Sequence, residues 1–338
     1  MRLVKESVRQ FARAKAVTYS EHYIVCSTGG QVKIFDKNLN LLQIIKGVRY
    51  VYKCLISPDE SKLLLVSAAN YFYIVELDTF CITKHTIKGK YSRNLEGNGC
   101  WSLDGNGCCF CVMSAEVNSA LRIYDDIQKD VYRELLCDKY WLTSILAIPK
   151  RNKYLLTGYD RANQKSYLIW FDGKKFEEYP VQGLSQFSAV KHAKLIENGD
   201  YCIVVGSNNT VFCTTEGIQI GDINLPETSP KTFSFSDVFK TFDINEESRA
   251  ELVNLSKQYG LEDMAVPDEI LDVCQSSNGR YFYVATLGSL LCINAKTHKK
   301  EVEKEYPFGV TAVEEICENL LLVNTWDSLE LVRIDFEQ

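Results

Sequence analysis

The stretch YLIWFD, Tyr167 to Asp172, is an apolar run that ends on an aspartate and is followed by Gly-Lys-Lys. The same pattern recurs as VKIFD ending at Asp36, YIVELD at Asp78, LRIYD at Asp125 and LVRID at Asp335. Each run is predicted to be a buried strand that meets a turn, because a terminal Asp or Asn can accept a hydrogen bond from the backbone N–H two residues on.

A second apolar run precedes each of these strands and usually follows a turn signal, as in SPDESKLLLVS and SLDGNGCCFCVMS. Two variants of this motif end near Thr214 and at Asn294. The strands therefore end at residues 36, 78, 125, 172, 214, 294 and 335, which are 42, 47, 47, 42, 80 and 41 residues apart. Spacings near 40 residues are typical of four-stranded blade repeats, so the apolar motif that ends on Asp is predicted to be the third strand of each blade.

The doubled spacing is interpreted as a helical insertion near residues 225–267, between the fifth and sixth blades. An eighth, degenerate blade is the alternative, but the sequence of this segment does not resemble strands. A capping box, one apolar helical face and a terminating glycine predict a helix here. The residues that carry these signals are Asp243 and Glu246, then Leu252, Leu255 and Tyr259, and finally Gly260.

The two ends of the sequence complement each other. Only Phe-Glu-Gln follows Asp335, so the seventh blade lacks its fourth strand. Residues 1–11 precede the first strand of the first blade and are predicted to supply the missing strand. Pairing of the two termini removes an open sheet edge that would otherwise invite aggregation.

The chain resembles a WD-repeat-like β-propeller. The resemblance rests on SPDESKLLLVS and on the aromatic-Asp pairs that end three strands, Phe35-Asp36, Tyr124-Asp125 and Phe171-Asp172. It implies an all-β protein of seven four-stranded antiparallel blades, forming a single domain over residues 1–338. The Gly-His pair of that family is missing and Trp326-Asp327 begins a strand instead of ending one, so the family's hydrogen-bonded tetrad is not expected.

Composition narrows the class of protein. The 338 residues are 46% hydrophobic and 24% charged, with a formal net charge of −6, which argues against a general nucleic-acid binder. No apolar stretch is long enough to cross a bilayer and no secretory signal is evident, so neither membrane nor export is expected. Thirteen cysteines lie in strand-like surroundings, and we interpret them as core residues in a reducing, cytoplasmic compartment.

Signals for catalysis are sparse. Of the four histidines only His192 lies on a predicted first strand, and the first strands otherwise offer Asp272, Glu314 and Glu315 but no ring of carboxylates. Cys108 and Cys111 have Cys-x-x-Cys spacing, but on a strand they point to opposite faces. We therefore predict no catalytic residues, metal or cofactor. A propeller hydrolase or lactonase with a metal at the central channel is the alternative function.

The connectors from one blade's fourth strand to the next blade's first strand are rich in aromatic and basic residues, which are frequent at interface hot spots. Because these connectors open on one face, we expect them to form a partner-binding site, with the helical insertion as a lid or docking arm. The predicted function is a non-enzymatic scaffold for a protein or peptide partner, acidic or amphipathic. The candidate residues are Arg49, Tyr50, Tyr91, Arg93, Lys139, Tyr140, Trp141, Phe187 and Phe308.

Overall fold

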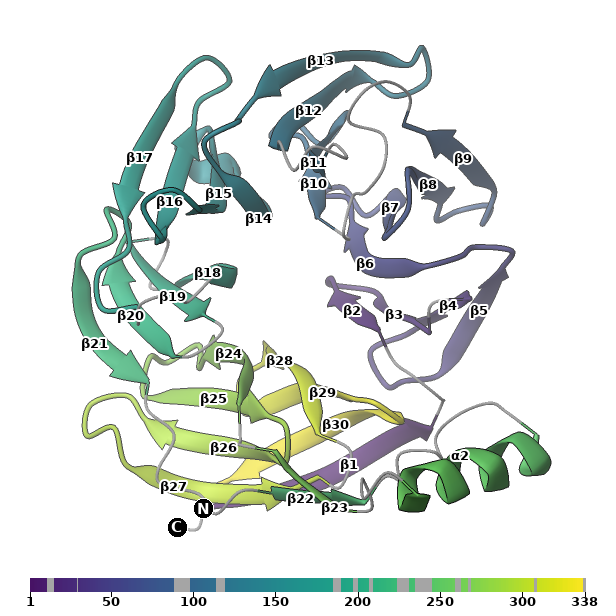
Figure 1. The fold of residues 1–338 in the computed structure, drawn as a ribbon. Coiled ribbons are helices and arrows are strands. Elements are labelled where there is room, and N and C mark those ends of the chain that lie inside the picture. Colours follow the sequence, from purple (N-terminus) through teal and green to yellow (C-terminus); the bar gives the residue numbers. More distant parts are fainter. Residues whose placement is uncertain are drawn as a thin grey trace. The chain divides into compact units, whose positions relative to one another are not determined.

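The described residues form seven four-stranded antiparallel sheets, one two-stranded sheet and an α-helix (Figure 1). The seven-bladed β-propeller class predicted from the sequence is thereby confirmed. The computed structural model describes residues 1–10, 15–28, 30–87, 98–113, 119–184, 190–196, 200–206, 209–223, 231–234, 245–258, 263–266, 269–306 and 309–336. These residues divide into two compact units, residues 15–223 and residues 1–14 with 224–338.

The first unit contains five blades. The first is β2 (Ala16–Tyr19), β3 (Ile24–Ser27), β4 (Gln31–Phe35) and β5 (Leu41–Lys46), and the second is β6 (Val51–Ile56), β7 (Lys62–Ser67), β8 (Tyr71–Glu76) and β9 (Ile82–Thr86). The third is β10 (Gly99–Trp101), β11 (Cys108–Met113), β12 (Ser119–Asp126) and β13 (Val131–Leu136). The fourth is β14 (Trp141–Ile148), β15 (Lys153–Asp160), β16 (Lys165–Phe171) and β17 (Phe176–Pro180), with the 3-10 turn η1 (Pro149–Arg151) between its first two strands. The fifth is β18 (Val190–Ile196), β19 (Tyr201–Gly206), β20 (Thr210–Thr214) and β21 (Gln219–Ile223).

The second unit contains the remaining two blades and the insertion. The sixth blade is β24 (Ile270–Gln275), β25 (Tyr281–Thr286), β26 (Ser289–Asn294) and β27 (Lys300–Glu305). The seventh is β28 (Val310–Cys317), β29 (Leu320–Thr325), β30 (Ser328–Asp335) and β1 (Arg2–Gln10). The insertion contributes β22 (Lys231–Ser234), α2 (Glu246–Gln258) and β23 (Asp263–Val266).

The recurring apolar motif that ends on Asp or a related polar residue is the third strand of each blade, as predicted. Asp36, Asp172 and Asn294 each accept a hydrogen bond from the backbone N–H two residues on, at 2.9, 2.8 and 3.0 Å. In the third blade the turn is closed by Asp126, not by Asp125, and the donor is the backbone N–H three residues on at 3.1 Å. A short polar side chain therefore ends the strand because it satisfies the first N–H groups of the turn.

A second turn motif recurs between the first and second strands of three blades, as Ser57–Asp59, Ser102–Asp104 and Ser276–Asn278. In the first of these, the Ser57 hydroxyl donates to Asp59 Oδ1 at 2.6 Å and accepts from the backbone N–H of Lys62 at 2.9 Å. The turn is thus held by side-chain bonds that replace part of the strand ladder. This is the physical basis of the SPDES and SLDGN signals.

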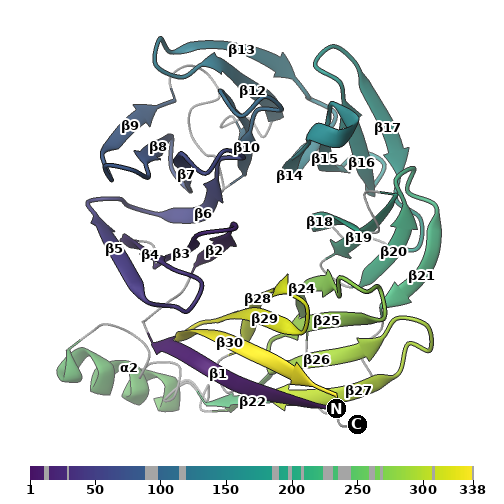
Figure 2. The ribbon, with the colours of Figure 1, turned by 180° about the vertical axis from the view of Figure 1, so that it is seen from behind.

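The N-terminal strand completes the last blade, as predicted. β1 pairs antiparallel with β30 over the full length of both strands, and Figures 1 and 2 show the two side by side. The Glu330 side chain, only 3% exposed, lies between the ammonium groups of Lys5 and Lys304, the latter at 3.5 Å. It also accepts a hydrogen bond from the Tyr306 hydroxyl at 3.0 Å. A buried carboxylate thus links the first strand, the last strand and the sixth blade.

The helix predicted in the insertion is present as α2, but its start differs. Asn245 Oδ1 accepts a hydrogen bond from the backbone N–H of Ser248 at 2.7 Å, so Asn245 is the N-cap. Leu252 is half-buried and Leu255 is 42% exposed. The residues predicted to cap, extend and end the helix, Asp243, Tyr259 and Gly260, lie outside the described residues. Contrary to the prediction, the insertion also contains strands. β22 precedes the helix in the sequence, β23 follows it, and the two pair antiparallel with each other.

Cysteines fill the cores between blades. All thirteen are free thiols, and all except Cys81 and Cys317 are buried. Cys108 packs with the second blade, whereas Cys111 faces the fourth, which confirms that the Cys-x-x-Cys pair points to opposite faces. Burial raises the pKa of the Cys108 thiol well above its usual value, so this sulfur is a packing group and a poor nucleophile or metal ligand.

Candidate partner-binding site

Five of the nine predicted site residues are described, and they belong to two connectors. Arg49 and Tyr50 join β5 to β6, Lys139 and Tyr140 join β13 to β14, and Trp141 is the first residue of β14. The remaining four, Tyr91, Arg93, Phe187 and Phe308, lie outside the described residues. The two described connectors place these five residues in very different environments.

The connector before β6 holds an aromatic ring in solvent. Tyr50 is 59% exposed although its backbone has a φ of 54°, a conformation that non-glycine residues rarely adopt. Two hydrogen bonds fix this conformation: the Ala68 N–H donates to the Tyr50 carbonyl at 2.8 Å, and the Arg49 N–H donates to the Tyr73 hydroxyl at 3.2 Å. The connector backbone is therefore fixed while the Tyr50 ring remains exposed to solvent.

The connector before β14 is anchored by Tyr140. This side chain is only 5% exposed, and its hydroxyl donates to Glu178 Oε2 at 2.5 Å. Lys139 Nζ donates to the same oxygen at 2.7 Å. Burial and the adjacent Glu178 carboxylate raise the pKa of the Tyr140 hydroxyl, and the hydrogen bond to Glu178 raises the pKa of Lys139. Tyr140 is therefore a packing residue, and the Lys139 charge is already paired.

Trp141 has a different role from its neighbour. It is half-buried, and its Nε1–H donates to the Met113 sulfur at 3.1 Å. The guanidinium of Arg161, from the turn between β15 and β16, lies 5.0 Å from the Trp141 ring centroid, within the range of a cation–π contact. The sequence-based prediction did not include Arg161 because it was limited to the connectors between blades. Arg161 lies in a turn within the fourth blade, and this turn is next to the connector that precedes β14. The turn signal Asp-Arg-Ala-Asn was available in the sequence.

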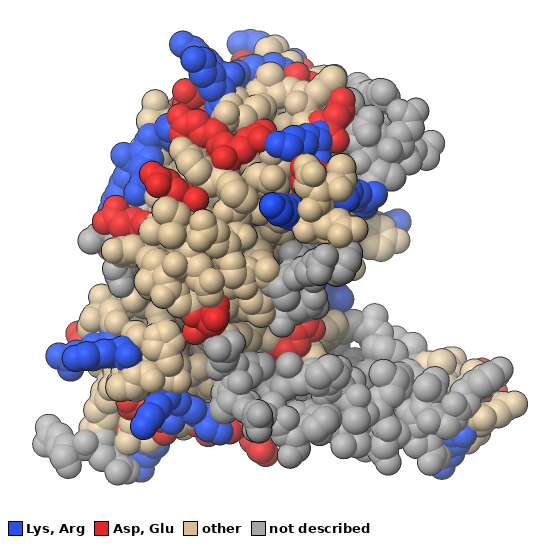
Figure 3. Space-filling view, turned by 60° about the vertical axis from the view of Figure 1, so that its left-hand side comes forward, with Lys and Arg blue, Asp and Glu red and all other residues tan. Residues whose placement is uncertain are grey.

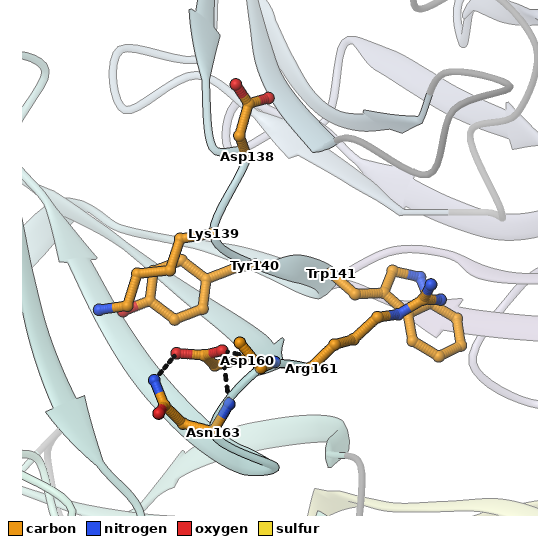
Figure 4. Close-up of a pocket in the computed structure, with 8 residues that line it drawn as sticks. Asp138, Lys139, Tyr140, Trp141, Asp160, Arg161 and Asn163 are labelled. Carbon is orange, nitrogen blue, oxygen red and sulfur yellow. Dashed lines mark hydrogen bonds between the residues drawn. The ribbon is translucent and has the colours of Figure 1, made fainter.

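A cavity of about 320 Å³ lies between the connector and this turn (Figure 4). Its lining residues are Asp138, Lys139, Tyr140, Trp141, Asp160, Arg161, Ala162 and Asn163. In Figure 4, Arg161 reaches toward the Trp141 ring, and Asp138 points away from it. The cavity therefore combines an aromatic wall with an exposed guanidinium.

The Asp160 carboxylate shapes the turn that carries Arg161. It is 2% exposed and accepts hydrogen bonds from the backbone N–H of Ala162 at 3.0 Å and from Asn163 Nδ2 at 2.8 Å. Burial opposes ionisation of this group, but the hydrogen bonds from Asn163 and Ala162 outweigh it and hold the Asp160 pKa below its usual value. Asp160 is thus a charged carboxylate engaged with its own turn.

A smaller cavity of about 140 Å³ adjoins the first, with which it shares Asp138, Lys139 and Tyr140. Its other lining residues are mainly apolar: Leu136, Cys137, Leu142, Ile169, Phe176 and Glu178. Leu136 is 59% exposed at the end of β13. Two adjoining cavities therefore share one connector, and the smaller one combines aliphatic and aromatic side chains with the charged groups of Asp138, Lys139 and Glu178.

Two of the three carboxylates considered for catalysis, Asp272 and Glu315, accept hydrogen bonds from the backbone. Asp272 Oδ2 accepts from the backbone N–H of Val313 at 3.0 Å and its Oδ1 from that of Val273 at 2.9 Å. Glu315 accepts from the backbone N–H groups of Ser277 and Asn319. Within the described part of the chain, no group of three or more His, Cys, Asp or Glu side chains is arranged to hold a metal ion. The Asp272–Val313 and Glu315–Ser277 hydrogen bonds join the sixth and seventh blades.

Charges of both signs are interspersed over the face seen in Figure 3, and neither forms a continuous field on it. Among the helices of the described residues, none is both long and apolar enough to span a bilayer.

No protein-family profile and no curated protein sequence match the chain. Among solved structures, the chain is similar to the Cps50 (Swd1) β-propeller domain of Myceliophteria thermophila, with a TM-score of 0.67 and 11% sequence identity. The match covers 99% of this chain and 100% of that domain. At this identity the likeness shows the fold, which is the β-propeller expected from the sequence. The residues of the connectors must therefore be interpreted from their own chemistry.

Proposed function

We propose that this protein is a non-enzymatic interaction module that binds a protein or peptide partner through its blade-to-blade connectors. The observation that carries the proposal is the exposed Tyr50 ring, together with the Trp141–Arg161 stack beside the larger cavity. Tyr, Trp and Arg contribute more to binding hot spots than other residue types. Loops on a rigid scaffold are the usual place for such residues.

The rigidity of the connectors supports this function. Tyr140 is buried and bonded to Glu178, and the Tyr50 backbone is fixed by hydrogen bonds to neighbouring strands. A connector backbone held in this way loses little conformational entropy when a partner binds, so more of the contact energy is available for affinity. The same anchoring removes Tyr140 itself from direct contact with a partner.

The cations at the connectors favour an acidic or amphipathic partner. Lys139 is paired with Glu178, so among the described residues of the two connectors and the adjoining turn, the cations without an acidic partner are Arg49 and Arg161. Their charge contrasts with the net charge of −6 of the whole chain. Opposite charges on a partner would steer association to this face and raise the association rate at low ionic strength.

The test is a binding experiment with exposed residues replaced one at a time. Affinity capture with the full chain, followed by mass spectrometry, identifies a candidate partner, whose affinity is then measured for the wild type, Tyr50→Ala and Trp141→Ala. Leu42→Ala, at a site 49% exposed on the fourth strand β5, is the control. We expect one or both connector variants to lose about 2 kcal/mol or more of binding free energy and the control to lose none. Equal affinity of all four proteins would refute the connector site.

A further inference from the structure

The Arg161 guanidinium is held in place without an acidic partner in the described part of the chain. Its side chain is exposed and lies over the Trp141 ring. Arg151 provides a comparison within the same blade: it lies 5.3 Å from the Trp170 ring centroid but also pairs with Asp200 at 3.3 Å. Stacking on an indole positions the guanidinium while leaving its edge N–H groups available for a bidentate acceptor.

The charges around the cavity favour a singly charged acceptor over a phosphate. Lys139 is already paired with Glu178, which leaves Arg161 as the cation available to a ligand among the lining residues. Asp138 and Asp160 belong to the same lining. A phosphate group carries nearly two negative charges and would be repelled by these carboxylates nearly twice as strongly as a single carboxylate, which matches one guanidinium in charge and geometry.

The adjoining smaller cavity supplies an apolar contact beside this anion site. Leu136, Leu142 and Ile169 contribute to its lining, and its volume of about 140 Å³ suits a single aliphatic side chain. Because the two cavities share the connector residues Lys139 and Tyr140, a chain lying across this connector reaches both. Burying the exposed Leu136 side chain would add a favourable apolar contribution.

We infer that the fourth blade recognises a two-part motif in the partner: an Asp or Glu side chain that pairs with Arg161, and a nearby aliphatic side chain that enters the cavity beside Leu136. This inference rests on the proposed function and defines which peptides the module selects. Arg161 and Leu136 are its specificity-determining residues, and Trp141 orients the guanidinium.

The test uses a displayed library of random dodecapeptides selected on the immobilised full chain. Enriched peptides are synthesised and their affinities are measured by fluorescence anisotropy for the wild type, for the variants Arg161→Gln, Leu136→Ser, Trp141→Ala and Tyr50→Ala, and for the matched control Arg151→Gln. Each peptide is also made in three altered forms: with its acidic residue changed to the corresponding amide, with that residue changed to phosphoserine, and with its aliphatic residue changed to alanine. Circular dichroism melting curves establish that each protein variant is folded.

We expect the enriched peptides to carry Asp or Glu close to Leu, Ile, Val or Met. Arg161→Gln should weaken binding about tenfold or more, and the amide peptide should be weakened by a similar factor with the wild type but not further with Arg161→Gln. Arg151→Gln should bind like the wild type, Leu136→Ser should weaken only peptides that retain the aliphatic residue, and phosphoserine peptides should bind more weakly than acidic ones.

Two results would overturn the inference in distinguishable ways. Peptides that lose affinity with Trp141→Ala or Tyr50→Ala but not with Arg161→Gln would refute the two-part motif and leave the proposed function standing. A selection that enriches no peptide would count against both. Tighter binding of phosphoserine peptides would assign the Arg161 site to phosphate instead of carboxylate and would likewise refute the motif.

Discussion

Replacing Tyr140 separates packing from binding at the connector, because its ring and its hydroxyl have different partners. The ring packs in the core between the third and fourth blades with Leu142 and Ile169, and the hydroxyl bonds to Glu178. Tyr140→Ala removes both interactions, and Tyr140→Phe removes only the hydrogen bond. Both variants should be compared with Trp141→Ala, whose ring is half-buried.

The structure sets the order of the three effects on the free energy of unfolding. Truncation of a buried aromatic ring costs about 3–5 kcal/mol, so Tyr140→Ala should be the most destabilised. Tyr140→Phe should lose about 1 kcal/mol, since Glu178 keeps its bond to Lys139 and is partly exposed to water. Trp141→Ala should cost less than Tyr140→Ala because part of its ring already contacts solvent.

Urea unfolding followed by circular dichroism measures these differences, and peptide affinity is measured in parallel. We expect Trp141→Ala to affect affinity more than stability and Tyr140→Ala to affect stability more than affinity. If Tyr140→Ala unfolds within about 1 kcal/mol of the wild type, its ring does not contribute a core contact of the usual size and the packing argument is wrong.

Three further predictions concern the scaffold. Arg122 is 1% exposed and pairs with Glu134, which is 25% exposed, so Arg122→Met should lose about 1.5–3 kcal/mol of unfolding free energy, measured by urea denaturation, and should recover part of it when combined with Glu134→Gln. Deletion of residues 1–11 exposes the edge of β30 and removes one cation beside the buried Glu330, so the melting temperature should fall markedly; equal melting of the two proteins would refute the role of β1. Hydrogen bonds from the Ser57 and Ser61 hydroxyls hold the Asp59 pKa at about 2, below its ordinary value of 3.8. The stabilisation by this carboxylate is therefore fully present above about pH 4 and is lost as pH falls toward 2, so the melting-temperature difference between wild type and Asp59→Asn should shrink over that window.

The repeat could be predicted from the sequence because several blades end their third strand with the same local hydrogen-bonding motif. Polar residues such as Asp36 and Asp172 end third strands by bonding the next N–H groups, and these bonds depend only on neighbouring residues. The pairing of β1 with β30 was also predictable, since a missing strand at one end matched a spare segment at the other. The β22–β23 pair was missed because its strands are short and lie far apart along the chain.

The site was only partly predictable, for a geometric reason. Tyr140 immediately precedes β14 and Trp141 is its first residue, and the two line the same cavity but differ in burial. Which of two neighbouring aromatic residues is buried depends on packing between blades, which the local sequence does not record. Arg161 contacts Trp141 only because the β15–β16 turn lies beside the connector in the folded protein, and no local sequence pattern predicts this tertiary contact.

The anchoring of the connector explains why buried residues matter to an exposed site. Glu178 lies on β17, the fourth strand of the blade, and bonds both Lys139 and Tyr140. This arrangement fixes the backbone just before Trp141 and neutralises the Lys139 charge, which leaves Arg161 as the cation without an acidic partner among the residues that line the cavity. A site with one available guanidinium and a preformed aromatic wall gains affinity mainly by avoiding ordering costs. Its specificity should therefore be set by the position of one carboxylate, not by the total charge of the partner.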